Sequence, residues 1–482
     1  MPNPVLPNLA FPFRFELWWS DALVWLLVAA AIGLVVYTRS RPHLRAPWAR
    51  VARSASGMAA AVVLTMFVLA GLLDSVHYRA ALPLQDGKAA WSTEVLSLLD
   101  RVLEPLRVTR EKTYSAPLAT HLYAKETVQL QDGREARVYP RLRHGGAHLK
   151  DPQADWRRDV VLKAFRGLAF GLLLWFAAAI TICAAVARGG DADIETVWRD
   201  AWAGRTAVPW RAVFCAFGLL CVLIGPVAAL APYYHVLGTD KVGQDVLYQA
   251  LKSIRTGLVI GTLATLVMLP FALVLGLMAG YFRGWVDDAI QYVYTTLSSI
   301  PGVLLIAAAV LMMQVYIENH AELFPTTEIR ADVRLLALCA ILGVTSWTGL
   351  CRLLRGEALK LREMEYIQAA HAFGVSHWRI MMRHITPNVM HIVMIALVMD
   401  FSGLVLAEAV LSYVGVGVDP SMISFGTMIN SARLEMAREP MVWWSLAAAF
   451  VFMLALVLAA NLFADAVRDA FDPRLILTGG RP

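Results

Sequence analysis

The segment EYIQAAHAFGVSHWRIMMRHITPN, residues 365–388, is polar, basic and helix-prone, although it lies between two strongly apolar stretches. Ala369 and Ala370 are small enough to let a helix lie flat in a groove of another protein. Three aromatic side chains could anchor such a helix: Tyr366, Phe373 and Trp378. The segment could therefore dock as a helix in a groove of another protein. An amphipathic helix resting on anionic lipid is the alternative, and composition alone does not separate the two.

The local pattern around this segment predicts two short helices. Good helix formers begin at Gly356 and are interrupted at Gly374, Val375 and Ser376. Pro387 has no N–H and cannot continue a helix already in progress. We therefore expect a short helix, a sharp turn and a second short helix that ends before Pro387, all at a membrane surface.

Two carboxylates fall in the apolar stretch that follows. Asp400 lies near its middle, where a charge is costly, so it is expected to face protein or water and could attract a substrate's ammonium group. Pairing with a Ser, Arg or Lys of a neighbouring helix is the alternative, since buried charges are normally paired. Glu408 lies nearer the outer surface, and we expect it to make a structural hydrogen bond to the following loop.

No constellation typical of catalysis is found in the sequence. There is no nucleophile elbow, no H-E-x-x-H and no convergent carboxylate pair, and the histidines are scattered. The five cysteines lack metal-ligand spacing, so neither a metal site nor a disulfide is predicted. A G-x-x-x-x-G-K-[ST] loop is also absent. We predict a chain without enzyme activity, without a cofactor and without bound nucleotide.

Membrane helices must position these groups. The chain has 482 residues, of which 58% are hydrophobic and 17% charged, and its mean hydropathy of +0.56 lies outside the range of soluble proteins. The apolar runs are long enough for helices and none alternates as a barrel strand would, so an all-α polytopic fold is predicted. Nine spans are expected: 17–38, 57–77, 160–186, 209–232, 256–280, 286–316, 333–354, 388–411 and 441–463.

Short loops rich in arginine predict the orientation of these spans. Arginines between the first two spans place that loop in the cytoplasm and the N-terminus outside. Counting forward, the segment 365–388 and the C-terminal tail fall in the cytoplasm. The first apolar run lacks a cleavage site and is expected to be an anchor. The formal charge of +6 is explained by basic loops beside anionic lipid, so no nucleic acid partner is expected.

Three blocks follow along the chain. Residues 1–186 hold three spans, residues 187–208 form a cytoplasmic connector, and residues 209–482 hold six spans. A long extracytoplasmic segment, 78–158, lies within the first block. Glycines at GxxxG spacing, such as Gly276 and Gly280, indicate close helix packing in the third block.

The extracytoplasmic segment is predicted to be a small α+β unit. Apolar residues recur at helical spacing: Val95, Leu98, Leu99, Val102 and Leu106. A hairpin is expected to turn at Asp132 and Gly133. Shielding a pore mouth, docking a partner and bracing the added helices are all open roles for this unit.

The stretch QAAHAFGVSHWRIMMRHITP resembles the EAA loop of binding-protein-dependent ABC importer permeases, which has an alanine pair, a glycine and a proline at fixed spacing. Other stretches are similar, in the same order, to the second permease subunit of dipeptide, oligopeptide and nickel importers. They are HVLGTDKVGQDVL, SIRTGL, GYFRGWVDD, SSIPGVLL, EAVLSYVGVGVDP, SFGTMI and RDAFDPRL. Together they cover about residues 190–482, and nothing of that kind covers residues 1–186, which we interpret as an N-terminal extension.

The resemblance implies a type I ABC importer fold in a bacterial inner membrane, with a cytoplasmic coupling loop at 356–387. Its implied partners are two ATPase subunits that bind ATP and Mg, a second permease of similar fold, an extracytoplasmic binding protein and membrane lipid. Peptides are the implied substrates, with nickel chelates or peptide-like compounds as alternatives. The residues implied in ATPase coupling are Tyr366, Gln368, Ala369, Ala370, Phe373, Gly374, Val375, Ser376, Arg379 and Pro387.

An outer-face loop is the second implied site, expected to be mainly scaffold, with contact to the binding protein as the alternative. It comprises His235, Gly238, Thr239, Asp240, Gly243 and Asp245. Thr239 or Asp240 is predicted to cap the helix that follows.

Three departures from the family pattern predict a coupling contact that is retained but altered. Gln368 replaces an acidic residue, Thr386 replaces a leucine, and Phe463-Ala464 stands where a glycine is usual. A secondary transporter that uses Asp400 is the rival hypothesis, although no inverted repeat supports it.

Overall fold

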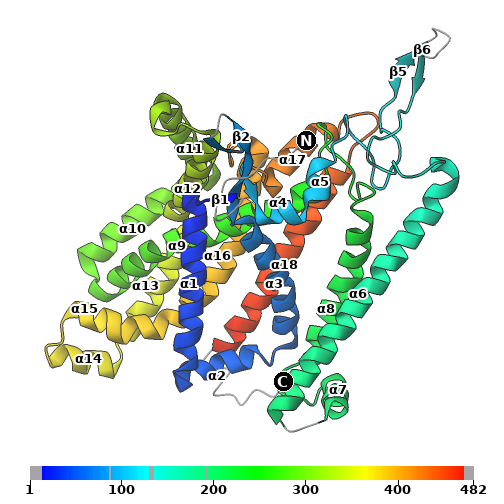
Figure 1. The fold of residues 1–482 in the computed structure, drawn as a ribbon. Helices are drawn as coiled ribbons and strands as arrows, with labels where there is room; N and C mark the ends of the chain where they lie inside the picture. Colours follow the sequence, from blue (N-terminus) through cyan, green and yellow to red (C-terminus); the bar gives the residue numbers. More distant parts are fainter. Residues whose placement is uncertain (1–12, 86–87, 130–134, 191–192, 472–482) are drawn as a thin grey trace. The chain divides into compact units, whose positions relative to one another are not determined.

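The computed structural model describes residues 13–85, 88–129, 135–190 and 193–471 (Figure 1). Within this part of the chain, eight helices are long and apolar enough to cross a membrane, or nine if one bent pair counts as a single span. The polytopic all-α prediction is therefore confirmed. The eight helices are α1 (Trp19–Arg39), α3 (Ala55–Asp74), α6 (Pro152–Gly190), α8 (Trp210–Leu230), α9 (Val246–Phe282), α11 (Gly302–Asn319), α16 (Thr386–Val414) and α18 (Trp444–Phe471).

The chain forms two compact units. The first comprises Met1–Ala31, Ala61–Thr256 and Ile423–Leu456. The second comprises Ile32–Ala60, Gly257–Met422 and Val457–Pro482. Each unit takes residues from both sides of the predicted connector, so the units are not the predicted domains.

The first unit contains the short strands. Strand β2 (His77–Gln85) pairs with β1 (Phe13–Glu16), β3 (Lys88–Trp91) and β4 (Leu96–Ser97), all antiparallel. A separate hairpin joins β5 (Glu126–Gln129) to β6 (Glu135–Val138), with Val128 opposite Ala136. Its predicted turn at Asp132 and Gly133 lies outside the described residues. The unit also holds α7 (Ile194–Ala203) and α17 (Phe425–Glu435).

The predicted helix in segment 78–158 is two short helices, α4 (Leu98–Val102) and α5 (Glu104–Val108). Pro105, in the first turn of α5, requires a new helix to begin there. Because the helix is broken, the predicted apolar face is wrong in part: Leu99 and Leu106 are buried, whereas Leu98 and Val102 are exposed.

In the same unit α6 and α8 run side by side (Figure 1). Gly167 and Gly171 of α6 face Gly225 and Cys221 of α8, and a Cβ at either α6 glycine would overlap the backbone of α8. The two helices therefore approach as closely as backbones allow, which is the usual effect of small residues between membrane helices.

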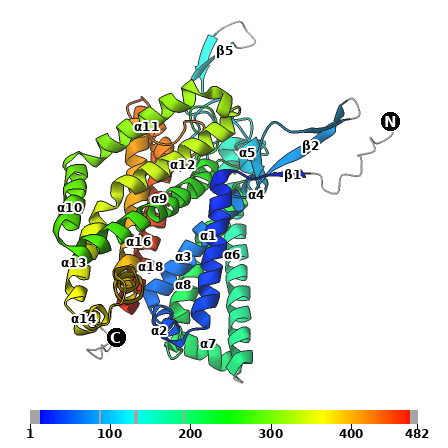
Figure 2. The same cartoon turned by 90° about the vertical axis from the view of Figure 1, so that its left-hand side faces the viewer.

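In the second unit the predicted span 286–316 is wrong as a single helix. It is broken into α10 (Gly284–Ser299) and α11 (Gly302–Asn319), which meet at an angle in Figure 2. Ile300 is extended, with φ −88° and ψ 132°, because it precedes Pro301. The neighbouring span bends by 40° between α12 (Thr327–Ser346) and α13 (Thr348–Arg362).

The segment after α13 forms α14 (Glu365–Ala372), α15 (His377–Ile380) and a π-helical turn (Met381–Ile385) that leads directly into α16. The prediction that the second helix ends before Pro387 is therefore wrong. The wide π turn accommodates a proline that would interrupt a regular helix, and the Thr386 hydroxyl donates to the Met381 carbonyl at 2.9 Å. The unit also holds α2 (Pro42–Val51) and a short 3₁₀ turn (Ala321–Leu323).

The predicted glycine contacts of α9 are confirmed. A Cβ at Gly276 would press on Cys351 and Leu354, and one at Gly280 would press on Ala358 and the Arg355 carbonyl. These glycines bring α9 against α13, within the hydrophobic core of the second unit.

Candidate coupling site

Helix α14 is a short helix bounded by clear signals. Met364 precedes it in an extended conformation, and Glu365 places a carboxylate in its first turn, where the helix dipole favours negative charge. Gly374 follows it with φ +70°, a conformation that favours glycine, and the Val375 N–H donates to the Ala370 carbonyl at 3.1 Å. The structure therefore places the sharp turn where the glycine predicts it.

One side of α14 is exposed and aromatic. Tyr366 is 43% exposed and Phe373 is 87% exposed, and the small exposed residue Ala369 lies between them at helical spacing. We call these three residues the docking face. Trp378 of α15, 59% exposed, lies just beyond the turn. An aromatic ring that is almost fully exposed on a polar segment is typical of an anchor for another protein.

The opposite side of α14 is fixed to the protein. Ile367 is buried in the core of the second unit, and Ala370 and Val375 pack against that core. Two of the residues predicted for ATPase coupling, Ala370 and Val375, therefore hold α14 in place. On the docking face itself, Asn388 of α16 donates a hydrogen bond of 3.2 Å to the Tyr366 hydroxyl.

The remaining predicted coupling residues are distributed around the turn. Ser376 and Arg379 are exposed, and Pro387 lies in the first turn of α16. The Gln368 side-chain amide donates to the Glu363 carbonyl at 3.1 Å.

Ion pairs attach the helices that carry α14. Arg355 of α13 binds both carboxylate oxygens of Asp287 in α10, at 2.6 and 2.7 Å. Arg283, which precedes α10, pairs with Glu363 between α13 and α14. A bidentate arginine pair restricts relative rotation of two helices. A displacement of α14 would therefore be passed to α13 and α10.

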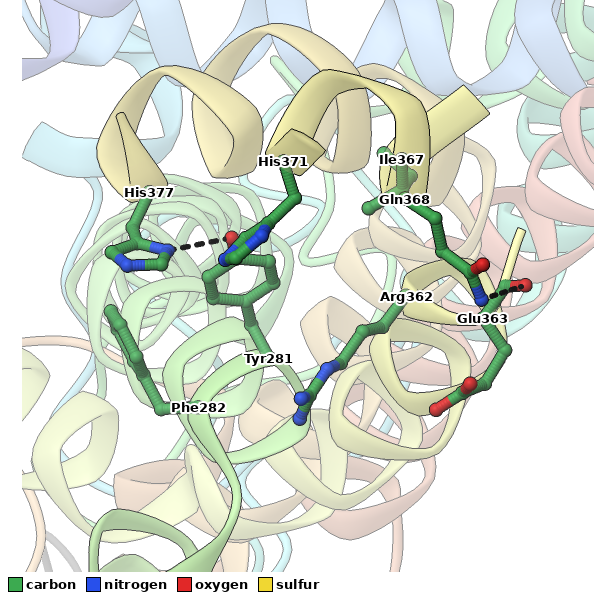
Figure 3. Close-up of a pocket in the computed structure, with 8 residues that line it drawn as sticks. All are labelled: Tyr281, Phe282, Arg362, Glu363, Ile367, Gln368, His371 and His377. Carbon is green, nitrogen blue, oxygen red and sulfur yellow. Dashed lines mark hydrogen bonds between the residues drawn. The ribbon is translucent and has the colours of Figure 1, made fainter. Parts of the chain in front are cut away.

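A cavity of about 310 Å³ lies against the inner side of α14 (Figure 3). Its lining residues are Tyr281, Phe282, Arg362, Glu363, Ile367, Gln368, His371 and His377. Of these residues, only Gln368 was predicted from the sequence to belong to the coupling site. His371 lies one turn after Ile367, and this spacing could have predicted an inward-facing histidine.

The predicted outer-face loop forms a buried polar cluster with segment 78–158. The His235 Nδ1 atom lies 2.7 Å from Asp245 Oδ2, and its Nε2 atom lies 3.6 Å from Glu111 Oε1. Glu111 also accepts three backbone N–H bonds from residues 143–145. The sequence pattern contained no signal that paired Glu111 with this loop.

The rest of the loop is bound to the same segment. Thr239 accepts a hydrogen bond from the Ser115 N–H at 2.7 Å. Gly238 and Gly243 have φ +74°, and a Cβ at Gly243 would overlap the backbone of Glu111. These close contacts fit the scaffold interpretation.

The predicted helix cap in this loop is wrong. Asp245 caps α9, because its Oδ1 atom accepts the N–H groups of Leu247 and Tyr248 at 2.8 and 3.2 Å. Asp240 instead closes the preceding turn, where it accepts the Gln244 N–H at 2.8 Å. The cap lies nearer α9 because the turn from Asp240 to Gln244 must close before the helix begins.

We expect the protein to lose stability as the pH rises from about 6.5 to 9. Burial opposes the charge on His235, but the carboxylates of Asp245 and Glu111 outweigh it and raise its pKa from 6.5 to about 9. Because the pKa of His235 is higher in the folded protein, the protonated ring stabilises the fold fully below pH 6.5, and this contribution, on the order of 3 kcal/mol, is lost as the pH rises to 9.

Glu111 acts at the other end of the pH range. Burial opposes its ionisation, but His235 and the backbone N–H groups lower its pKa from 4.5 to about 2, so its contribution to stability is lost only in acid.

Thermal unfolding measured at several pH values checks the prediction for His235. The loss above pH 6.5 should be absent in His235→Gln, and an equal loss in that variant would contradict it.

Asp400 and Glu408 occupy different environments. Asp400 is half-buried, and no hydrogen bond or ion pair joins it to another described residue. Glu408 is buried and accepts a hydrogen bond of 2.7 Å from Ser412, one turn later in α16.

Comparison with known proteins points to one family. Residues 272–477 match the family model described as binding-protein-dependent transport system inner membrane component. The oligopeptide transport system permease protein OppC of Mycobacterium tuberculosis (strain ATCC 25618 / H37Rv) is 34% identical over 239 residues, which cover 50% of this chain and 76% of OppC. The family match, residues 272–477, includes α14 and its turn.

Two further relatives agree. The glutathione transport system permease protein GsiD of Pectobacterium atrosepticum is 30% identical over 308 residues, covering 59% of this chain and 94% of GsiD. The dipeptide transport system permease protein DppC of Lactococcus lactis subsp. cremoris is 28% identical over 240 residues, covering 50% of this chain and 64% of DppC.

Proposed function

Since this chain belongs to the binding-protein-dependent transport system inner membrane components, we propose that it forms half of a translocation path and is driven by a cytoplasmic ATPase that binds α14. It is a multi-pass membrane protein and a permease subunit of an ABC importer. The proposed permease domain is residues 209–482, preceded by the extension 1–186 and the connector 187–208.

The docking face carries this proposal. Phe373 and Tyr366 are exposed on a helix whose other side is fixed by Ile367. Such a helix can be gripped by a partner without unfolding. The pair of Arg283 with Glu363 lies just before α14, and the pair of Arg355 with Asp287 joins α13 to α10, so the three helices can move together as a rigid lever.

The proposed mechanism is alternating access. Two ATPase subunits bind ATP and Mg and close, and their closure moves α14 together with α13 and α10. The spans then expose the path first to one side of the membrane and then to the other. This chain supplies the lever and the path, and its partners supply the ATP hydrolysis.

The other proposed partners are a second permease of similar fold, an extracytoplasmic binding protein and membrane lipid. We propose an N-terminus outside and a cytoplasmic C-terminus, which places α14 beside the ATPase. The relatives are named for oligopeptides, dipeptides and glutathione, and this supports peptides or peptide-like solutes as substrates.

Reconstitution tests the proposed function. The chain, co-purified with its ATPase and second permease, is placed in proteoliposomes with the binding protein and a radiolabelled dipeptide. We expect uptake that requires ATP and is unaffected by ionophores. Uptake that follows an ion gradient without ATP would instead support a secondary transporter.

Asp400 is proposed to line the path and attract the ammonium group of a substrate, which its lack of a partner among the described residues supports. We expect Asp400→Asn to raise the KM for a dipeptide about tenfold, the usual cost of one charged hydrogen bond, and to spare an N-acetylated dipeptide. If Asp400→Asn changes neither the uptake of the dipeptide in proteoliposomes nor the preference for it over the N-acetylated dipeptide, Asp400 does not line the path.

A further inference from the structure

We propose that the cavity between α9, α13 and α14 binds a phosphate group and thereby holds α14 in its observed position (Figure 3). Binding depends only on the residues that line the cavity. Its effect on transport rests on the proposed coupling role of α14.

An unsatisfied cation lies in the cavity. The Nη1 atom of Arg362 is buried and has no hydrogen-bond partner in the described part of the chain. Leaving a buried charged donor unpaired costs more than leaving a neutral one, so an acceptor is expected there. The carboxylate of Glu363 is already paired with Arg283, and its carbonyl accepts the Gln368 amide.

Two imidazoles face the same space. The rings of His371 and His377 are 5.4 Å apart, and His377 Nδ1 forms a hydrogen bond of 2.8 Å with the Tyr281 hydroxyl. This bond occupies Nδ1 and leaves the Nε2 atom of His377 available to a ligand. Figure 3 shows His371 and Gln368 extending from α14 toward Tyr281 and Arg362. A guanidinium and imidazoles around one cavity are suited to a phosphate.

The position of the cavity favours a phosphate over a carboxylate of the docked ATPase. The cavity lies against the inner side of α14, where Ile367 is buried, whereas the docking face points away from it. A protein that covers Phe373 therefore contacts a different side of α14 from the one that lines the cavity.

The cavity also lies at the end of a spanning helix. Tyr281 and Phe282 are the last residues of α9, and Trp285, just beyond them, is 80% exposed. Aromatic residues at the end of a span mark the depth of lipid headgroups, and basic pockets between helices at this depth bind them. The phosphate can therefore come from an anionic lipid or from solution.

Gln368 makes the cavity accept an anion. A glutamate here would place a carboxylate among the same donors and compete with the phosphate for Arg362. Gln368→Glu keeps the size of the side chain and adds a negative charge, so it should weaken phosphate binding. Gln153→Glu, on the exposed first turn of α6, is the matched control.

The experiment measures binding without transport. The purified complex is studied in phosphatidylcholine nanodiscs titrated with inorganic phosphate, and in nanodiscs that also contain phosphatidylglycerol, with retained lipid counted by native mass spectrometry. We expect Arg362→Gln and Gln368→Glu to weaken binding of one of these probes at least about tenfold, and Gln153→Glu to leave it unchanged. Retained phosphatidylglycerol would identify a lipid source, and saturable inorganic phosphate a soluble one.

The proposal would be overturned if Arg362→Gln bound each probe as tightly as the wild type does. It would also be overturned if the wild type bound neither probe. In that case, a carboxylate of a partner protein would be the remaining acceptor for Arg362. The ATPase activity of the same samples distinguishes a failure of the phosphate site from a failure of the proposed coupling function. A complex that binds phosphate but shows no coupled ATPase activity would refute the proposed function and not the site.

Discussion

Replacing Phe373 by alanine is expected to reduce ATP-driven uptake at least about tenfold while the thermal stability of the permease stays unchanged. The ring is 87% exposed, so it contributes little to folding. Truncating an aromatic anchor at an interface costs about 2 kcal/mol or more, or roughly 30-fold in affinity. Uptake in proteoliposomes and recovery of the ATPase on the immobilised permease measure the two effects.

Trp285 provides the control for this prediction. It is 80% exposed and lies at the start of α10, outside the docking face. Trp285→Ala should leave ATPase recovery unchanged. Equal losses in the two variants, or normal uptake by Phe373→Ala, would show that the docking face is not where the ATPase binds.

The second large effect is expected at Asp21. Its Oδ1 atom lies 2.5 Å from Arg255 Nη2, its Oδ2 atom lies 2.8 Å from His77 Nδ1, and all three side chains are buried. Asp21→Ala leaves the Arg255 charge buried and uncompensated, which costs about 3–5 kcal/mol. The free energy of unfolding in detergent should fall by that amount.

An exposed pair gives the matched comparison. Arg101 and Glu104 lie 2.8 Å apart, with 67% and 46% of their side chains exposed, and Glu104→Ala should cost less than about 1 kcal/mol. Asp21→Asn should be milder than Asp21→Ala, because the amide oxygen still accepts from Arg255. Equal destabilisation by Asp21→Ala and Glu104→Ala would contradict the prediction.

Buried ion pairs attach the N-terminal extension to the part of the chain that resembles the importer permeases. Asp21 belongs to the extension, whereas Arg255 belongs to the SIRTGL stretch that resembles the importer permeases. One turn earlier, Lys252 lies 2.6 Å from Asp74 and 3.1 Å from Asp100 of the extension. Within the first unit, two clusters of charges therefore join the extension to the start of α9.

The spans could be predicted from the sequence, but their breaks could not. Apolar length decides whether a helix can cross a membrane, and this property is local. The effect of a proline depends on its surroundings: Pro301 breaks a span between α10 and α11, whereas Pro387 is accommodated by a π turn before it. From the sequence, the span 286–316 was predicted to continue through Pro301 and a helix was predicted to end before Pro387, and the packed structure reverses both.

In the site too, features within one helix could be predicted from the sequence, whereas contacts between distant residues could not. The docking face follows from the spacing of Tyr366, Ala369 and Phe373, because these residues share one helix. The cavity depends on Tyr281, 96 positions before its partner His377, and no periodicity links residues so far apart. The pairing of His235 with Glu111 was missed for the same reason.

Crosslinking from position 373 tests the coupling role of α14 most directly. A photoactivatable crosslinker is attached to Phe373→Cys in a chain whose native cysteines are replaced, and the assembled importer is irradiated in membranes. We predict an adduct with the ATPase, and none from Trp285→Cys. Adducts from position 373 with phospholipid only, or labelling of that cysteine by an impermeant reagent at the outer face, would contradict the account.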